Sequence, residues 1–256
     1  MKDCKEPLVM CLTNSVAQDI TANALLAIGA KPAMVSEPEE AAELSQVADA
    51  ILINLGTVDA RQEKTMLAAL TGSVPQKMGT VPWVLDPVAV HLLSYRREVM
   101  RKLLSVRLPA AIRGNLAEIS YIRNFSISKM GSVPPKMGSV PSKMGSAFGC
   151  VGLSASARVP MLGTGETDLL YMGTDPKKGT EPIKISGGVE MLTKVTATGC
   201  TQGAIVAAFI GRGQSPVEAL LAASHLMKQA GERAWEKAKA PGSFRVALID
   251  ALAELS

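Results

Sequence analysis

Aromatic side chains are scarce in this 256-residue chain, where they make up 4% of the residues, although hydrophobic residues make up 47%. The core must therefore be built from Ala, Val, Leu, Ile and Met. Such a core is typical of parallel sheets covered by helices and argues against a β-sandwich. Charged residues make up only 20%, which excludes a wholly disordered chain. The length fits one large α/β domain.

Several classes of protein lack support in the sequence. Positive residues are scattered and the net charge is only +4, which argues against a nucleic-acid-binding protein. No apolar run reaches the roughly 18–20 residues that cross a bilayer, and the first ten residues lack a signal-peptide pattern. We therefore expect a cytoplasmic protein with neither a membrane nor a nucleic-acid partner.

Metal and redox motifs are also missing. The four cysteines show no CxxC spacing, and the two histidines lie far from them in the sequence. A structural zinc site or a redox pair therefore has no support. The chain contains neither a GxxxxGK[ST] motif nor a GxGxxG motif, so any nucleotide must be held in another way.

Short β-like runs alternate with longer helical patterns along the chain. Repeated crossovers of this kind predict a single domain, residues 1–256, with a mostly parallel sheet and helices on both faces. We predict strands at residues 33–35, 51–56, 82–86 and 110–113, helices at 16–28, 38–50, 59–70 and 94–104, a hairpin at 168–186, and further helix starts at Asn115, Thr201, Pro216, Gly231 and Val246.

A seven-residue repeat interrupts the alternation. Units of the type KMGSVP fill residues 129–146, and a related copy begins at Gln76. Gly in every unit and Pro in most of them exclude a continuous helix. We predict a low-complexity loop. A tolerated insertion is the simpler interpretation, and a partner-binding arm is the alternative.

The sequence Thr196-Ala197-Thr198-Gly199-Cys200 precedes an apolar helical pattern. A glycine-containing turn at a helix start offers free N–H groups and a positive dipole end to a phosphate or a developing oxyanion. Cys200 would have a favoured thiolate at that position. Alternatively, Gly199 allows tight packing and Cys200 is a buried apolar residue.

Charged residues mark the ends of two predicted strands. Asp86 ends the strand at residues 82–86 and lies at the carboxyl edge, where open α/β sheets bind ligands; alternatively it forms a turn. Glu118 follows Asn115 at a spacing that suits a metal or phosphate site but equally forms a helix capping box. Arg113 could grip phosphates or form a surface ion pair.

Nine segments in order resemble the hydroxyethylthiazole kinases of thiamine salvage. No single segment is decisive, but together they span about residues 7–255, except roughly 123–162. The segments are residues 12–14 (LTN), 21–23 (TAN), 29–34, 54–57 (NLGT), 85–89 (LDPVA), 113–118, 164–168 (TGETD), 198–200 (TGC) and 227–244.

The resemblance implies a ribokinase-like three-layer sandwich, assembled as a homotrimer with active sites between subunits. It implies transfer of phosphate from ATP, with Mg²⁺, to the hydroxyl of 4-methyl-5-(2-hydroxyethyl)thiazole. In related sugar kinases an Asp stands where this chain has Cys200, which could act as a base or only shape the anion site. The implied roles are catalysis for Cys200 and Gly199, ATP binding for Arg113, Thr164 and Asn115, substrate binding for Met34, Gly199 and Asn14, and Mg²⁺ linkage for Asp86 and Glu118.

Residues 123–162 depart from the family pattern. Pro160 and Gly163 are expected to weaken the strand that delivers Thr164 to the nucleotide, because proline removes a donor from the ladder. We therefore predict weakened ATP binding or stability. Two alternative functions stay open. One is a hydroxymethylpyrimidine kinase or a hydro-lyase on the same fold, which Cys200 disfavours. The other is an impaired protein that binds thiazole without turnover.

Overall fold

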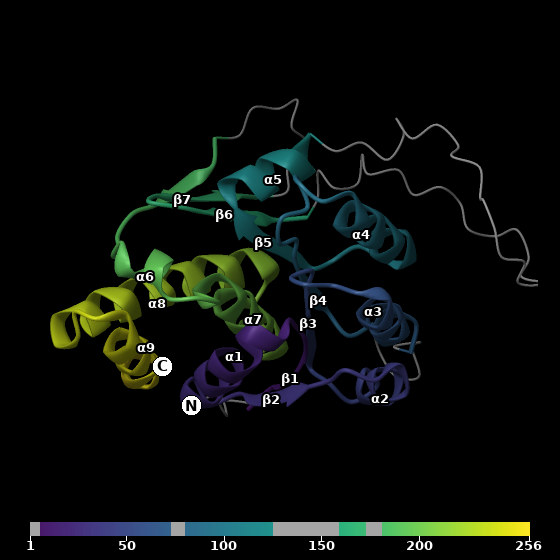
Figure 1. Cartoon of the computed structure of the whole chain (residues 1–256), viewed down its shortest axis with the longest axis horizontal. Helices are drawn as coiled ribbons and strands as arrows, with labels where there is room; N and C mark the ends of the chain where they lie inside the picture. The colour runs from purple at the N-terminus through teal and green to yellow at the C-terminus, as the bar shows by residue number, and fades with distance from the viewer. Residues whose placement is uncertain (1–5, 73–79, 125–158, 173–180) are drawn as a thin grey trace, which may run out of the picture.

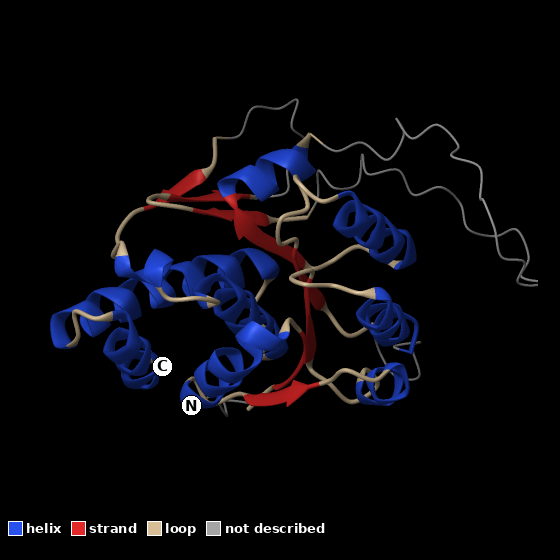
Figure 2. Cartoon of the chain, in the orientation of Figure 1, coloured by secondary structure: helices blue, strands red, loops and turns tan. Residues whose placement is uncertain are grey.

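The computed structural model describes residues 6–72, 80–124, 159–172 and 181–256. The repeat at residues 129–146 lies outside these ranges. The described residues form one eight-stranded sheet in the order β2-β1-β3-β4-β5-β6-β7-β8, which runs between two layers of helices (Figures 1 and 2). The strands are β1 (Leu8–Leu12), β2 (Lys31–Met34), β3 (Ala50–Asn54), β4 (Trp83–Asp86), β5 (Ala111–Asn115), β6 (Met161–Thr164), β7 (Asp168–Tyr171) and β8 (Ile183–Ile185).

Strand directions divide the sheet into two parts. Strands β2, β1, β3, β4, β5 and β6 are parallel, whereas β7 is antiparallel to both β6 and β8. The mostly parallel α/β sheet is therefore confirmed, and β7 with β8 forms the predicted hairpin pairing. Parallel strands bring their carboxyl ends to one edge, and that edge carries the site described below.

Side chains alternate between the two helical layers. In β3, Ala50 and Leu52 belong to the apolar cluster on the side of α1, α7, α8 and α9, whereas Ile51 and Ile53 belong to the cluster on the side of α2 to α5. This period of two buries both faces. The helices are α1 (Ser15–Ala27), α2 (Pro38–Leu44), α3 (Ala60–Gly72), α4 (Ser94–Val106), α5 (Leu116–Arg123), α6 (Met191–Lys194), α7 (Thr198–Gly211), α8 (Pro216–Lys237) and α9 (Pro241–Leu255).

Several predicted boundaries are wrong. The helix predicted over residues 38–50 ends at Leu44, and β1 lacks a predicted counterpart because its five apolar residues precede the first clear helical period. Gly231 does not start a helix but lies inside α8, where a Cβ would come within 2.8 Å of Leu192 Cδ1. The final helix begins at Pro241 rather than at Val246, since proline suits a first helical position.

Strand β6 is formed, contrary to the expected weakening. It pairs with β5 on one side and with β7 on the other. Pro160 precedes the strand, so no ladder donor is lost, and its carbonyl accepts the Ile112 N–H at 3.1 Å. Gly163 leaves room for α5, since a Cβ there would lie 2.9 Å from Leu116 Cδ2. The part of the expectation that rested on Pro160 and Gly163 is therefore wrong, whereas residues 125–158 of the departing segment lie outside the described residues.

Transmembrane helices are not found among the described residues, where every helix is too short or too polar to span a bilayer.

Candidate active site

Five adjacent strands each deliver one polar side chain to the carboxyl edge of the sheet. Asn54, Asp86, Arg113 and Thr164 lie within or at the ends of β3, β4, β5 and β6, and Asn14 follows β1 by two residues. Asn54 and Asp86 are direct partners in the parallel register. Strand pairing alone therefore arranges these residues, which are distant in sequence, in one row.

Hydrogen bonds fix one half of the row. Asn14 Nδ2 donates to Asn54 Oδ1 at 3.1 Å, and Asn54 Nδ2 donates to Asp86 Oδ2 at 2.6 Å. Asn14 also caps α1 by accepting the Ala17 N–H at 3.1 Å, and Asn54 Oδ1 accepts the Gly56 N–H at 2.8 Å. Each amide is thereby held in one orientation, with its donor directed along the row.

Asp86 is fully buried, and its second oxygen, Oδ1, has no hydrogen-bond partner. Burial raises the pKa of Asp86 from 3.8 to about 6 against the opposing charge of Arg113, and the charge of Glu118 contributes to this rise. Arg113 Nη1 lies 3.9 Å from Oδ1, too far for a hydrogen bond. A buried carboxylate with an unpartnered oxygen is a strong candidate to meet a cation.

Arg113 occupies the other half of the row and is also buried. Its Nε donates to Gln202 Oε1 at 3.0 Å, and its Nη2 donates to Thr164 Oγ1 at 2.9 Å. The guanidinium lies against Gly199, where a Cβ would come within 2.6 Å of Nη1. The packing interpretation of Gly199 is therefore confirmed: glycine at this position makes room for Arg113.

Glu118 forms a capping box with Asn115. Asn115 Oδ1 accepts the Glu118 N–H at 2.9 Å, and Glu118 Oε2 accepts the Asn115 N–H at 2.7 Å. The other oxygen, Oε1, accepts the Ala89 N–H at 2.7 Å. Ala89 has a φ of 55°, a strained value for a residue with a side chain. Glu118 thus caps α5 and holds the loop that follows Asp86.

Helix α7 begins at Thr198, three residues before the predicted start. Ala197, its N-cap, has a φ of 66° and no capping side chain. The Thr198 hydroxyl donates backwards to the Leu192 carbonyl at 2.8 Å and leaves the helix end uncapped. The first-turn N–H groups of Thr198, Gly199 and Cys200 lack intrahelical acceptors. The helix start therefore has unpaired N–H groups, and its use by an anion stays a prediction.

Cys200 is an uncharged thiol at neutral pH, so the expected thiolate is wrong. Burial raises its pKa from 9.0 to about 11, and the charge of Asp86 adds to this, while Arg113 opposes it. Asn14 Nδ2 lies 3.7 Å from the sulfur atom. The favourable helix end is outweighed because the thiolate would be largely buried beside a carboxylate.

A cavity of about 270 Å³ opens between β6, α6, α7 and α8. All three residues predicted to contact ATP lie in its wall, as does Gly199, so the structure brings these four together. Its lining comprises Arg113, Asn115, Thr164, Gly165, Asp168, Leu192, Thr193, Thr198, Gly199, Gln202, Met227 and Lys228.

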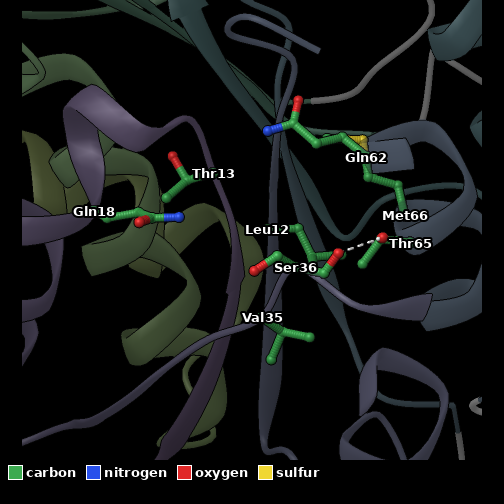
Figure 3. Close-up of a pocket in the computed structure, with 8 residues that line it drawn as sticks. All are labelled: Leu12, Thr13, Gln18, Val35, Ser36, Gln62, Thr65 and Met66. Carbon is green, nitrogen blue, oxygen red and sulfur yellow. Dashed lines mark hydrogen bonds between the residues drawn. The ribbon is translucent and has the colours of Figure 1, made fainter. Parts of the chain in front are cut away.

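A second cavity lies beside β1 and α3 and measures about 30 Å³ (Figure 3). The Thr65 hydroxyl donates across it to the Ser36 carbonyl at 3.0 Å. It holds about one water and is too small for an organic substrate. Its lining comprises Leu12, Thr13, Gln18, Val35, Ser36, Gln62, Thr65 and Met66.

Met34 is not part of the polar row. It ends β2, the strand on the far side of β1 from Arg113, and packs against the cluster under α1 and α7. The structure therefore places Met34 near the Asn14 end of the edge, opposite the large cavity.

Two members of the site, Asn54 and Gln202, have no role predicted from the sequence, although Asn54 belongs to one of the nine segments. Asn54 is the only polar residue of β3, and a buried polar residue at the end of an apolar strand was an available signal. Gln202 is buried in the second turn of α7, just before the apolar residues 203–211. Both side chains act through partners far away in the sequence, and neither spacing forms a motif.

No group of three or more His, Cys, Asp and Glu side chains that could hold a metal ion occurs in the described ranges. A cation at this edge would therefore need ligands from a bound substrate and water, which is the usual situation of Mg²⁺.

Comparisons with known proteins point to one family. The model of the hydroxyethylthiazole kinase family matches residues 2–256. The hydroxyethylthiazole kinase of Serratia proteamaculans is 40% identical over 251 residues, which cover 98% of this chain and 89% of the relative. The solved structure of a hydroxyethylthiazole kinase protein from Pyrococcus horikoshii superposes with a TM-score of 0.76 at 30% identity, covering 97% of this chain and 88% of the other.

A more distant solved structure extends the comparison of the fold alone. A ribokinase-like superfamily protein from Enterococcus faecalis has a TM-score of 0.60 at 16% identity, covering 97% of this chain and 87% of the other. The predicted ribokinase-like fold is therefore confirmed.

Proposed function

Since the chain belongs to the hydroxyethylthiazole kinase family, we propose that its carboxyl edge transfers the γ-phosphoryl group of ATP to the hydroxyl of 4-methyl-5-(2-hydroxyethyl)thiazole. The observation that carries this proposal is the row of polar side chains from Asn14 to Thr164, which links a large cavity to the uncapped start of α7. The product, a phosphate monoester, fits a role in thiamine salvage, and the use of ATP fits a cytoplasmic protein.

The cavity of about 270 Å³ is proposed to take ATP. Nε and Nη2 of Arg113 donate to Gln202 and Thr164, whereas Nη1 lies 3.9 Å from Asp86 Oδ1, which is too long for a hydrogen bond. Nη1 is therefore the Arg113 atom best placed to donate to a phosphate oxygen. The first-turn N–H groups of α7 lie beside it and suit the charge of the transferring group. The alcohol oxygen bonds to γ-phosphorus as the bond to the ADP oxygen breaks, and the alcohol proton leaves to solvent or a nearby base.

Mg²⁺ is proposed to accompany ATP, and the residues present fit it in part. Asp86 Oδ1 is an unpartnered, buried carboxylate oxygen, the donor type that this ion prefers. Both oxygens of Glu118 already accept backbone N–H groups, so Glu118 would act through water. When bound, the ion would neutralise phosphate charge during transfer.

The alcohol is proposed to bind at the Asn14 end of the row, near Met34 and Cys200. The small cavity in Figure 3 lies beside this end within one chain and is too small for the alcohol. Val16, two residues beyond Asn14, is 59% exposed. A second copy that covers this apolar surface would complete the pocket, which supports the homotrimer with active sites between subunits.

We therefore expect a mass near three times 26.8 kDa in light scattering after size exclusion. Val16→Asp should dissociate the assembly and raise the KM for the thiazole more than that for ATP, because the charge would have to be buried. A monomeric wild-type protein with full activity would contradict this arrangement.

Cys200→Ala is expected to lower kcat by no more than about tenfold, because the uncharged thiol does not act as the base. The measurement is steady-state kcat at saturating ATP between pH 6 and pH 9, with Cys200→Ser as the control that keeps a small polar group. A loss of more than about a thousandfold in Cys200→Ala, on the scale of a missing general base, would show that the thiol takes the proton.

Titration calorimetry with ADP and Mg²⁺ tests the nucleotide half of the proposal. Binding to wild type with micromolar affinity supports the assigned cavity. Absence of binding by a folded protein would contradict it.

A further inference from the structure

One face of α8 is turned toward the nucleotide cavity and its surrounding loops. Ser224, Lys228, Gly231 and Glu232 lie along this face at the spacing of successive helical turns. We refer to these four residues as the α8 support face. Lys228 itself lines the cavity, yet nothing in the proposed chemistry uses Lys228, Gly231 or Glu232.

Lys228 is a buried cation whose donors are all engaged. It is only 7% exposed. Its Nζ lies 3.3 Å from Asp168 Oδ1, 3.3 Å from the Glu166 carbonyl and 3.0 Å from the Gly187 carbonyl. An ammonium group has three donors, so none is left for a phosphate. Lys228 therefore joins parts of the protein to one another.

Asp168 completes the connection to the turn after β6. Its Oδ1 accepts the Gly165 N–H at 3.1 Å, and its Oδ2 accepts the Ser224 hydroxyl at 2.7 Å. The turn that follows Thr164 is thereby fixed to α8 from two sides. Since Thr164 and Gly165 line the cavity, the α8 support face sets the position of one of its walls.

The peptide unit between Gly187 and Gly188 is held at both ends from α8. Lys228 donates to its carbonyl at 3.0 Å, and Glu232 Oε1 accepts its N–H at 2.6 Å. Both glycines have positive φ, 104° and 84°, which other residues adopt only with strain. A single peptide held by two oppositely charged side chains cannot rotate without losing both bonds.

The segment after this peptide forms a second wall of the cavity. It leads into α6, which lies beside α8 in Figure 1, and Leu192 and Thr193 of α6 line the cavity. Leu192 packs against Gly231, where a Cβ would come within 2.8 Å. The Leu192 carbonyl accepts the Thr198 hydroxyl at 2.8 Å, which ties this wall to the start of α7.

We propose that Lys228 and Glu232 are positioning residues for ATP: they hold the Gly187–Gly188 peptide, and through it the α6 wall, at the distance from Thr164 and α7 that the nucleotide needs. This inference rests on the proposed function, since it takes the large cavity to be the ATP site. It assigns a role to the Lys228–Glu232 segment, which the sequence singled out without explaining it.

The deciding experiment compares Glu232→Leu with Glu232→Gln, because the amide oxygen of Gln can still accept the Gly188 N–H. Glu232→Leu is expected to raise the KM for ATP on the order of tenfold, the effect of one lost hydrogen bond. The KM for the thiazole and kcat at saturating ATP should change by less than about twofold. Glu232→Gln should restore the KM for ATP. Glu236→Leu, one turn further along α8, is the control and should match wild type.

Lys228→Met should raise the KM for ATP more than Glu232→Leu does. It removes the contacts that Lys228 makes with the Glu166 carbonyl and Asp168 on one wall and with the Gly187 carbonyl on the other. Because this variant leaves the Asp168 carboxylate without its cation, its result is compared with those of Glu232→Leu and Glu232→Gln, which remove no buried charge. Equal KM values for ATP in Glu232→Leu and Glu232→Gln would overturn the inference, as would an equal rise in both substrates' KM values. Failure of the proposed function is distinguishable, since wild type itself would then neither bind ADP nor turn over.

Discussion

Asp86→Asn is expected to lower kcat at least about a hundredfold and, at the same time, to make the protein more stable above pH 6. The loss of activity follows from the proposed role of Asp86, because a neutral amide binds a divalent cation more weakly than a carboxylate does, and losses of this size are typical when one such electrostatic group is removed. Asn54 would keep its hydrogen bond with the carbonyl oxygen of the new side chain, since that bond needs only an acceptor. The local fold should therefore persist.

The gain in stability follows from the raised pKa of Asp86. Burial moves this pKa from 3.8 to about 6, and each unit corresponds to about 1.4 kcal/mol. Keeping the buried carboxylate charged therefore costs up to about 3 kcal/mol above pH 6. The cost falls as the pH drops through 6 and is absent below 3.8, because the group is then protonated in the folded and unfolded states alike.

Urea denaturation of the metal-free protein at pH 8 and at pH 5 measures this effect. The free energy of unfolding of Asp86→Asn should exceed that of wild type by up to about 3 kcal/mol at pH 8, and the difference should shrink at pH 5. Asp250→Asn, on α9 far from the site, is the control and should change neither activity nor stability. A less stable Asp86→Asn protein at pH 8 would show that Asp86 is a structural residue.

Arg113→Ala is expected to raise the KM for ATP about ten- to hundredfold, the range of a hydrogen bond to a charged group, with a much smaller effect on the KM for the thiazole. Arg113 lines the cavity, and its guanidinium lies against the first turn of α7. Its removal also frees Thr164 Oγ1 and Gln202 Oε1 from their donor. The thiazole end of the row is held through Asn14 and Asn54, which Arg113 does not contact.

Initial rates over a matrix of ATP and thiazole concentrations separate the two KM values. Arg233→Ala, which removes an exposed ion pair with Glu254 at 3.2 Å, is the matched control and should stay within about twofold of wild type. Equal increases in both KM values for Arg113→Ala would assign it a structural role instead.

The sequence predicted the positions of the edge residues where local chemistry and strand ends coincide. Asp86 and Arg113 belong to predicted strands next to loops, and the parallel-sheet rule places such residues at one edge. The spacing of Asn115 and Glu118 predicted the capping box, and the structure added only the second role of Glu118 on Ala89. These features depend on a few neighbouring residues, so sequence patterns reveal them.

Features that depend on distant partners were not predictable. The charge state of Cys200 depends on its burial and on Asp86, and a helix start alone suggested the opposite. Lys228 donates to carbonyls that are 41 to 62 residues away in the sequence. Its role becomes visible only when the fold places those carbonyls beside α8. Gly163 suggested a weak strand, but its lack of a side chain makes room for α5.

Release of ADP from ATP and Mg²⁺, followed with and without hydroxyethylthiazole and with the product identified by mass, tests the central claim most directly. Hydroxymethylpyrimidine serves as the competing substrate. The account predicts turnover that depends on the thiazole and yields its phosphate monoester. A folded protein that binds the thiazole without releasing ADP, or one that phosphorylates hydroxymethylpyrimidine in preference, would contradict it.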